Sequence, residues 1–213
     1  MAYNENMRVY IIRHGESEAN AKGVYQHRDV QLSETGIKQA HTVAQRFLHI
    51  PIDSIYSSSF ERAKKTACII GDTIHKPVEL LPLLTEIKRP TVIEGKKQSE
   101  PEARIIMRLI KRMWHDPQWR HSDEETFFDL RTRAIKLLRH IEQFKNTEQV
   151  LLVSHGTFIR MLVCVMIYGE SVSPGKFKKY LRFLQTTNTG ITVCDYAPHH
   201  WRLLTWTSEA HLG

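Results

Sequence analysis

The chain has 213 residues, of which 41% are hydrophobic and 25% are charged, and its formal net charge is +7. This composition suits one sizeable globular domain and gives no support to a disordered, collagen-like or coiled-coil protein. The longest apolar run, Met161 to Tyr168, is far shorter than the roughly 20 residues that cross a bilayer. Met1 to Met7 lack the apolar core of a signal peptide. We therefore expect a cytoplasmic protein that does not bind membranes.

The first half of the chain predicts three strands and two helices. Short apolar and β-branched runs indicate strands over residues 8–12, 54–57 and 78–81. Ser33 is expected to cap a helix whose apolar positions recur at helical spacing and which ends before Pro51. A second helix is expected from about Ser59 to His75.

The second half predicts three helices and three strands. Ser99 to Glu102 has the S-x-x-E form of a capping box and is expected to open a helix that ends at Pro117. The same form at Ser122 to Glu125 predicts the start of a longer helix that runs to about Lys145. The remaining expected elements are a strand over 150–153, a buried helix over 157–168, and strands over 191–195 and 201–206 with a turn at Ala197-Pro198.

Strands that alternate with helices predict an α/β fold, here a three-layer α/β/α sandwich with a mostly parallel central sheet. The last two strands are joined too tightly for a crossover helix, so they should form an antiparallel hairpin at or near one edge. We expect residues 1–213 to form one domain, with a small helical cap inserted at about residues 87–121.

Most of the net charge lies in this expected cap. Between Lys88 and Arg120 there are nine Lys or Arg and four acidic residues, so this stretch carries +5 of the total of +7. Such a segment suits an anionic partner, which could be a phosphorylated substrate, a nucleic acid or a membrane surface. It could equally be a solvated helix face. We expect it to lie over the mouth of a pocket as a mobile cap.

Polar residues gather where the predicted parallel strands end, and ligands of open α/β sheets bind outside those carboxyl ends. The first strand ends in Arg13 and His14, and Arg62 follows the second strand. Glu86 follows the third strand, and the segment from Ser154 to Thr157 follows the fourth and enters a helix. Two arginines, two histidines and a carboxylate are therefore expected to converge.

This set of side chains suits phosphoryl transfer. Guanidinium groups match phosphate oxygens, and the helix after His155 offers free backbone N–H groups to an anion. A neutral imidazole can attack phosphorus to form a covalent intermediate, while Glu86 can protonate the leaving oxygen and then activate water. The sequence shows neither a glycine-rich phosphate loop nor spaced metal ligands. We therefore expect side chains to supply the positive charge, with no metal and no other cofactor.

The string VYIIRHGES, Val9 to Ser17, resembles the signature of the histidine phosphatase superfamily, which includes the cofactor-dependent phosphoglycerate mutases. The resemblance extends from Arg8 to about Asp195 and is weak only over residues 88–121. Further matches follow in the family's order at Asn20, Asp29 to Ser33, Gly36, Gln39-Ala40, Ser57-Ser58, Arg62-Ala63, Thr66-Ala67, Glu86 and Val153 to Gly156.

The resemblance implies a role for each catalytic candidate. His14 is implied as the nucleophile that becomes phosphorylated, and Glu86 as the donor and acceptor of the proton. Arg13, Arg62 and His155 are implied to hold the transferred phosphoryl group.

The substrate-binding candidates include three further residues. Asn20 matches a family position that contributes to the phosphate pocket. Gly156 and Thr157 begin the helix after His155, where backbone N–H groups are free to bind an anion.

The chain also departs from the family. The loop after Asn20 differs around Gln26, and Glu86 is followed by Ile87-Lys88-Arg89-Pro90 in place of the pattern Glu-Arg-x-Tyr of the mutases. These departures favour a metal-independent phosphatase that hydrolyses phosphate monoesters. A mutase-type phosphotransferase or isomerase and a non-catalytic protein that binds phosphorylated ligands stay open as alternatives.

The expected partner is a small phosphorylated substrate with a further anionic group, which would match the basic segment. We expect no nucleic-acid partner. The sequence favours no particular oligomeric state.

Overall fold

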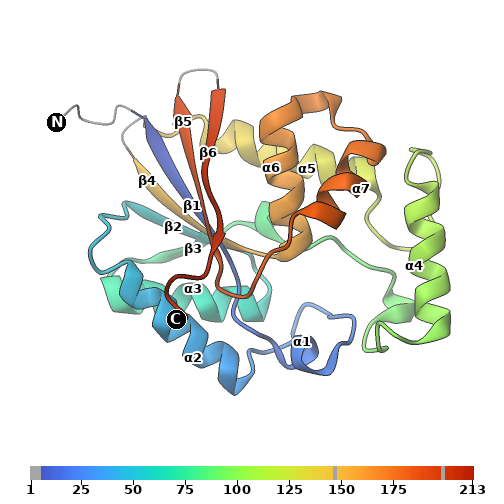
Figure 1. Ribbon diagram of the computed structural model, residues 1–213, viewed down its shortest axis with the longest axis horizontal. Coiled ribbons are helices and arrows are strands. Elements are labelled where there is room, and N and C mark those ends of the chain that lie inside the picture. The colour runs from blue at the N-terminus through green and yellow to red at the C-terminus, as the bar shows by residue number, and fades with distance from the viewer. Residues whose placement is uncertain (1–5, 146–147, 198–199) are drawn as a thin grey trace.

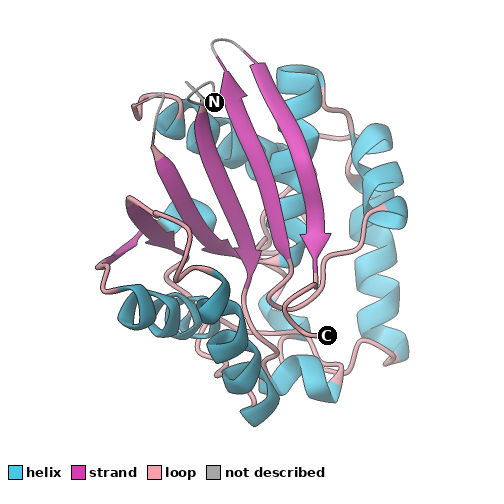
Figure 2. Cartoon of the chain, turned by 60° about the vertical axis from the view of Figure 1, so that its left-hand side comes forward, coloured by secondary structure: helices cyan, strands magenta, loops and turns pink. Residues whose placement is uncertain are grey.

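The structure, a computed structural model, describes residues 6–145, 148–197 and 200–213. The predicted N-terminal stretch before Asn6 and the turn residue Pro198 therefore lie outside the described residues. Within them, one six-stranded sheet is flanked by helices on both faces (Figure 1, Figure 2). Its strands are β1 (Met7–Arg13), β2 (Ser54–Ser57), β3 (Val78–Leu80), β4 (Gln149–Ser154), β5 (Ile191–Ala197) and β6 (His200–Ser208).

The strand order is β3-β2-β4-β1-β5-β6. The first four strands in this order pair in parallel, whereas β5 is antiparallel to both β1 and β6. The predicted mostly parallel sheet with an antiparallel hairpin at one edge is therefore confirmed. The four parallel carboxyl ends open on the same edge of the sheet, which is where the helices α1 and α4 lie (Figure 1).

Two apolar layers enclose the sheet because successive side chains of a strand point to opposite faces. Along β1, Val9 and Ile11 join the core that contains α5 and α6, whereas Tyr10 and Ile12 join the core that contains α2 and α3. The helices are α1 (Glu18–Lys22), α2 (Glu34–Arg46), α3 (Glu61–Ile74), α4 (Pro101–Met113), α5 (Phe127–Ile141), α6 (Gly156–Tyr168) and α7 (Pro174–Phe183). The predicted three-layer α/β/α sandwich is thus confirmed.

Two predicted helix starts are wrong. Helix α4 begins at Pro101 after Glu100, and Ser99 contributes no cap because proline takes the first helical position. Ser122 does not open α5. Instead, the backbone N–H of Ser122 binds Glu124 within a loop, and Thr126 caps the helix.

Three other details differ from the sequence prediction. Helix α5 ends at Ile141, earlier than the expected end near Lys145. The short helix α1 and the helix α7 were not predicted. Ser173 caps α7 and Pro174 follows at the first helical position, which is a start pattern that the sequence does contain. No helix of the described residues is both long and apolar enough to span a membrane.

Two glycines bring the loop after β1 against the start of α2. A Cβ atom on Gly36 would lie 1.9 Å from the carbonyl oxygen of Glu16, and one on Gly15 would lie 2.5 Å from the carbonyl oxygen of Gly36. Ser33, which caps α2 as predicted, also donates to the Glu16 carboxylate over 2.7 Å. This close backbone contact sets the position of the residues that follow β1.

We expect Gly36→Ala to destabilise the protein by about 1–3 kcal/mol or more, because the added methyl group meets backbone rather than a flexible side chain. Gly175→Ala is the matched control, since its Cβ would have only Ser173 Oγ nearby, at 3.9 Å. Alanine favours the helix there, so that variant should be as stable as the wild type or slightly more so. Urea denaturation measures both. Equal stability of the two variants would contradict the packing described here.

Candidate active site

A cavity of about 1250 Å³ opens at the carboxyl ends of the parallel strands. Seven of the eight candidate residues lie on its wall, while His155 is fully buried behind His14 with ring centroids 5.0 Å apart. The sheet therefore brings together the whole set predicted from the sequence. The seven on the wall are Arg13, His14, Asn20, Arg62, Glu86, Gly156 and Thr157.

His14 is held by one hydrogen bond at each ring nitrogen. Its Nδ1 lies 2.7 Å from the carbonyl oxygen of Gly15, which can only accept, so Nδ1 carries the proton. Its Nε2 accepts from Nε of Arg62 over 3.2 Å. Burial, followed by the charges of Arg62 and Arg13, lowers the pKa of His14 well below its ordinary value. The ring is therefore neutral at physiological pH, with its Nε2 lone pair toward the cation.

Arg13 and Arg62 both lack an acidic partner within ion-pair distance among the described residues. Arg62 is 2% exposed and also donates to the carbonyl of His27, and burial lowers its pKa to about 10. Arg13 donates to the carbonyl of Thr186, while its buried Nε has no partner in the described part of the chain. The buried Arg62 and the half-buried Arg13, each with donors to spare, form a site for an anion.

His155 caps α6 directly after β4 and is 0% exposed. Its Nε2 lies 2.8 Å from the hydroxyl of Ser58, and its Nδ1 is buried without a partner among the described residues. Burial, with the charges of Arg62 and Arg13 and the neighbouring His14, lowers the pKa of His155 well below its ordinary value. This second ring is therefore also neutral and has one nitrogen to spare.

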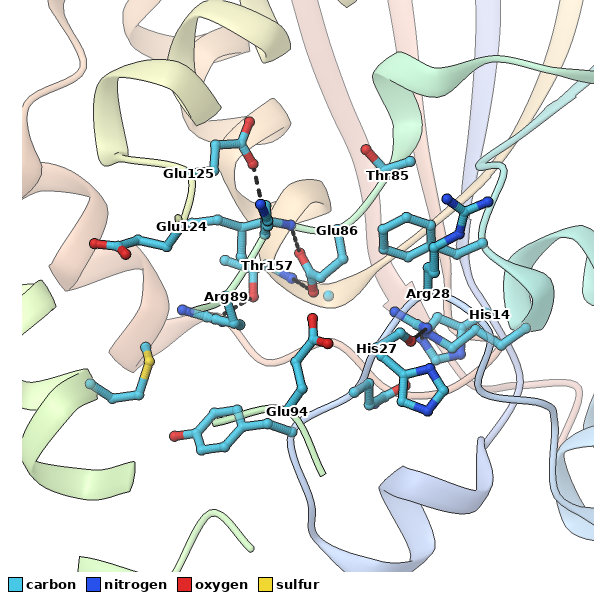
Figure 3. A pocket seen from close by; sticks show the side chains of 18 of the residues that line it. His14, His27, Arg28, Thr85, Glu86, Arg89, Glu94, Glu124, Glu125 and Thr157 are labelled. Carbon is cyan, nitrogen blue, oxygen red and sulfur yellow. Dashed lines mark hydrogen bonds between the residues drawn. The ribbon is translucent and has the colours of Figure 1, made fainter. Parts of the chain in front are cut away.

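Glu86 reaches the first turn of α6 from the segment after β3. Its carboxylate accepts from the backbone N–H of Thr157 over 3.0 Å (Figure 3). It also accepts from that of Phe158 over 3.0 Å and from that of Ile87 over 2.9 Å. The free N–H groups that were expected to bind an anion thus bind a carboxylate of the chain itself. A side chain held at this position faces the cavity and can exchange a proton with a ligand there.

The loop after β1 is held by amide groups. Asn20 accepts from Ser17 through its Oδ1 and completes the capping box of α1. Asn188, which the sequence did not single out, donates to the carbonyl oxygen of His14 over 2.9 Å. Gly156 leaves room for the side chains of Thr186 and Arg13, since a Cβ there would lie 2.7 Å from Thr186 Oγ1 and 3.5 Å from Nε of Arg13.

Arg133 is a further residue that the sequence did not reveal. From α5 it donates to the carbonyls of Leu83 and Thr85, over 2.9 and 2.7 Å, and it pairs with Glu125. These bonds hold the segment that carries Glu86. Because Arg133 is one of several cations on an amphipathic helix, its sequence context contains no indication of this role.

The basic segment contributes to the cavity wall, but some of its cations form ion pairs with acidic residues. Lys88 pairs with Asp123 and Lys96 with Glu102, and Lys97 does not line the cavity. Arg89 lines it, as does Lys111 of α4. The segment therefore lies at the cavity, and its movement as a cap stays a prediction.

The described residues show neither a disulfide nor a metal site. Cys68, Cys164 and Cys194 are free, and burial raises the pKa of Cys164 to about 11 and that of Cys194 to about 12. In the parts of the chain that the structure describes, no group of three or more His, Cys, Asp or Glu is placed to hold a metal ion. His199 lies outside those parts.

Comparison with known proteins identifies the family of this chain. The family model of the histidine phosphatase superfamily, branch 1, matches residues 9–209. The chain belongs to the histidine phosphatase superfamily. The resemblance found in the RHGES string is thereby confirmed over almost the whole chain.

Relatives in the superfamily are similar over most of their length. An adenosylcobalamin/α-ribazole phosphatase of Salmonella typhimurium is 26% identical over 89% of this chain and 92% of its own. A metal-independent phosphoserine phosphatase of Arabidopsis thaliana is 27% identical over 99% of this chain and 85% of its own. The structure of a phosphoserine phosphatase variant from Entamoeba histolytica, in complex with phosphoserine, is 28% identical with a TM-score of 0.80 and covers 97% of this chain and 100% of its own.

The two buried histidines make stability depend on pH. Both bind a proton more weakly in the folded protein than in the unfolded chain, where the pKa of histidine is about 6.5. Below that pH the unfolded state binds more protons than the folded state. The free energy of unfolding therefore falls as pH falls, by up to about 1.4 kcal/mol for each pH unit and each of the two histidines. Well above that pH both states are neutral and this contribution is absent.

We therefore expect His14→Asn and His155→Asn each to reduce the loss of stability between about pH 6.5 and pH 5. Urea denaturation at a series of pH values measures this slope. His41→Asn, at an exposed position of α2, is the control and should keep the slope of the wild type. An unchanged slope in both site variants would show that the two rings are not held neutral.

Proposed function

We propose that this protein is a metal-independent phosphatase that hydrolyses phosphate monoesters through a phosphohistidine on His14. The observation that carries the proposal is the buried, neutral ring of His14, whose Nε2 accepts from Arg62 and whose pKa is lowered by the charges of Arg62 and Arg13. Neither arginine has an acidic partner among the described residues. Membership of a superfamily whose relatives include phosphatases supports it.

In the first step, Nε2 of His14 attacks phosphorus and the bond from phosphorus to the ester oxygen breaks. The proton of a monoanionic ester passes through Glu86 to the leaving oxygen, which departs as an alcohol. The attack requires Nε of Arg62 to leave Nε2. That donor then becomes free for a phosphoryl oxygen, so the bond that orients the ring is exchanged for one that stabilises the transferred group.

In the second step, water attacks the phosphohistidine. Glu86 takes a proton from the water and passes it to the phosphate, the bond from nitrogen to phosphorus breaks, and the monoanion of inorganic phosphate leaves with His14 and Glu86 back in their starting states. Arg13 and Arg62 neutralise the phosphoryl oxygens in both steps, with His155, Asn20, the backbone N–H of Gly156 and the hydroxyl of Thr157 as further donors. The two guanidinium groups are why we expect turnover without a divalent metal.

The proposed substrate is a small phosphate monoester with a second anionic group. Relatives named as phosphoserine phosphatases support this class, since phosphoserine carries a carboxylate beside its phosphate. We propose that the protein works in the cytoplasm and binds neither nucleic acid nor membranes. A mutase is less well supported, because Ile87 to Pro90 lack the pattern of that subgroup.

Phosphohistidine has a diagnostic chemistry. Brief exposure to an ester labelled at phosphorus should leave phosphate on the protein that is labile in acid and stable in alkali, because the bond is a phosphoramidate. We expect His14→Ala to abolish this label. Mass spectrometry of the quenched protein locates it.

His41→Ala is the matched control, since His41 is an exposed histidine away from the cavity and its loss should leave labelling unchanged. Label that survives His14→Ala would overturn the assignment of the nucleophile. Binding of esters without label or turnover would favour the non-catalytic alternative.

The role of Glu86 is tested by the leaving group. Glu86→Gln keeps the shape of the side chain but removes its exchangeable proton, so kcat for an alkyl phosphate should fall by roughly 10²–10⁴. For p-nitrophenyl phosphate, whose leaving group needs little protonation, we expect a much smaller loss. Steady-state kinetics with both esters measures the difference. Equal losses would indicate that Glu86 only positions α6.

A further inference from the structure

Besides Arg13 and Arg62, three cations of the cavity wall are free of acidic partners. Arg89, Lys111 and Arg160 form no ion pair with any described residue, whereas the other lysines and arginines of the wall do. The paired ones include Arg120 with Asp129 and Arg133 with Glu125. Arg160 comes from α6, outside the basic segment in which the sequence predicts the extra charge.

Arg89 and Arg160 are both anchored on the first turn of α6. Nε of Arg160 donates to the carbonyl oxygen of Gly156 over 3.0 Å. Arg89 donates to Oγ1 of Thr157 over 3.4 Å, and Figure 3 shows it beside Thr157 at the cavity. Since Gly156 also lies against Arg13, these cations are neighbours of the proposed phosphate site.

The charges of these residues act on one another. Burial is the main cause that lowers the pKa of Arg89, Arg160 and Lys111, and for Lys111 the charges of Arg89, Arg160 and Arg182 add to it. Like charges that repel one another this closely are stabilised when an anion binds among them. The charge of Glu86, which is held by α6, acts in the opposite direction on Arg89 and Arg160, as does that of Glu125 on Arg89. Glu94 also lines the cavity (Figure 3).

We propose that Arg89, Lys111 and Arg160 form a second anion subsite that binds a carboxylate or phosphate group of the substrate, a short distance from the ester phosphate. The inference rests on the proposed function, because the subsite shares the cavity of His14. It assigns selectivity for small phosphorylated acids to three residues from three separate segments. The fork-shaped guanidinium of Arg89 suits the paired oxygens of such a group. Arg160 offers Nη2, since its Nε and Nη1 donate to backbone carbonyls of Gly156, Leu181 and Leu184.

Two esters that differ in one group test the subsite. Glycerol 3-phosphate and 3-phosphoglycerate share a three-carbon chain, and only the second has a carboxylate. We expect the wild type to prefer 3-phosphoglycerate. Arg89→Gln and Lys111→Gln should each reduce kcat/KM for it by about 10–100-fold, mainly through KM, and change kcat/KM for glycerol 3-phosphate by less than about threefold.

Matched variants keep the test independent of folding. Arg108→Gln removes a charge from an exposed position of α4 that does not line the cavity, so it should affect neither ester. Arg89→Lys keeps the charge without the fork and should show an intermediate loss. Glu94→Gln removes a negative charge from the wall and should lower KM for 3-phosphoglycerate. Thermal denaturation confirms that each variant is folded.

Binding separates this inference from the proposed function. Calorimetric titration of the two esters into His14→Ala protein needs no turnover, and preferential binding of 3-phosphoglycerate that Lys111→Gln removes would support the subsite even if the wild type were inactive. Turnover of both esters with equal efficiency, unchanged by Arg89→Gln and Lys111→Gln, would overturn the subsite while leaving the phosphatase intact. Equal losses for both esters would also overturn it.

Discussion

The site depends on one hydrogen bond between two buried side chains, in which Nε of Arg62 donates to Nε2 of His14. Together with the Gly15 carbonyl at Nδ1, this bond selects one tautomer, while burial and the charges of Arg62 and Arg13 keep the ring neutral. The same guanidinium is a buried cation without an acidic partner among the described residues, so the ligand-free site holds positive charge that an entering phosphate neutralises. The contact between Arg62 and His14 therefore orients the nucleophile and also forms part of the anion site.

The sheet places this contact. In the parallel pairing of β1 with β4, Arg13 lies opposite Ser154, so the residues that follow them, His14 and His155, become neighbours. Pairing of β2 with β4 then brings Ser58 to the ring of His155. Strand order thus assembles the site from segments that are far apart in the chain. Helices that begin after these strands add donors at the same edge.

The regular parts of this arrangement could be predicted from the sequence, since apolar runs of strand length and the string at Arg13-His14 indicate buried strands that end in polar loops. The capping boxes were misassigned at Ser99 and Ser122 because Pro101 and Thr126 offer better starts nearby. Counting charges along the sequence identifies the basic segment, but it does not show which of its cations lack an acidic partner. That depends on tertiary neighbours, as do the contacts of Arg133 and Arg160.

The state of the His14 ring tests this view most directly, and nuclear magnetic resonance of protein with ¹⁵N-labelled histidine reports it. We predict a neutral ring with the proton on Nδ1 and none on Nε2, unchanged as pH falls through the ordinary histidine pKa of about 6.5. A ring that takes up a proton near that pH, or that carries its proton on Nε2, would contradict a nucleophile held ready by Arg62.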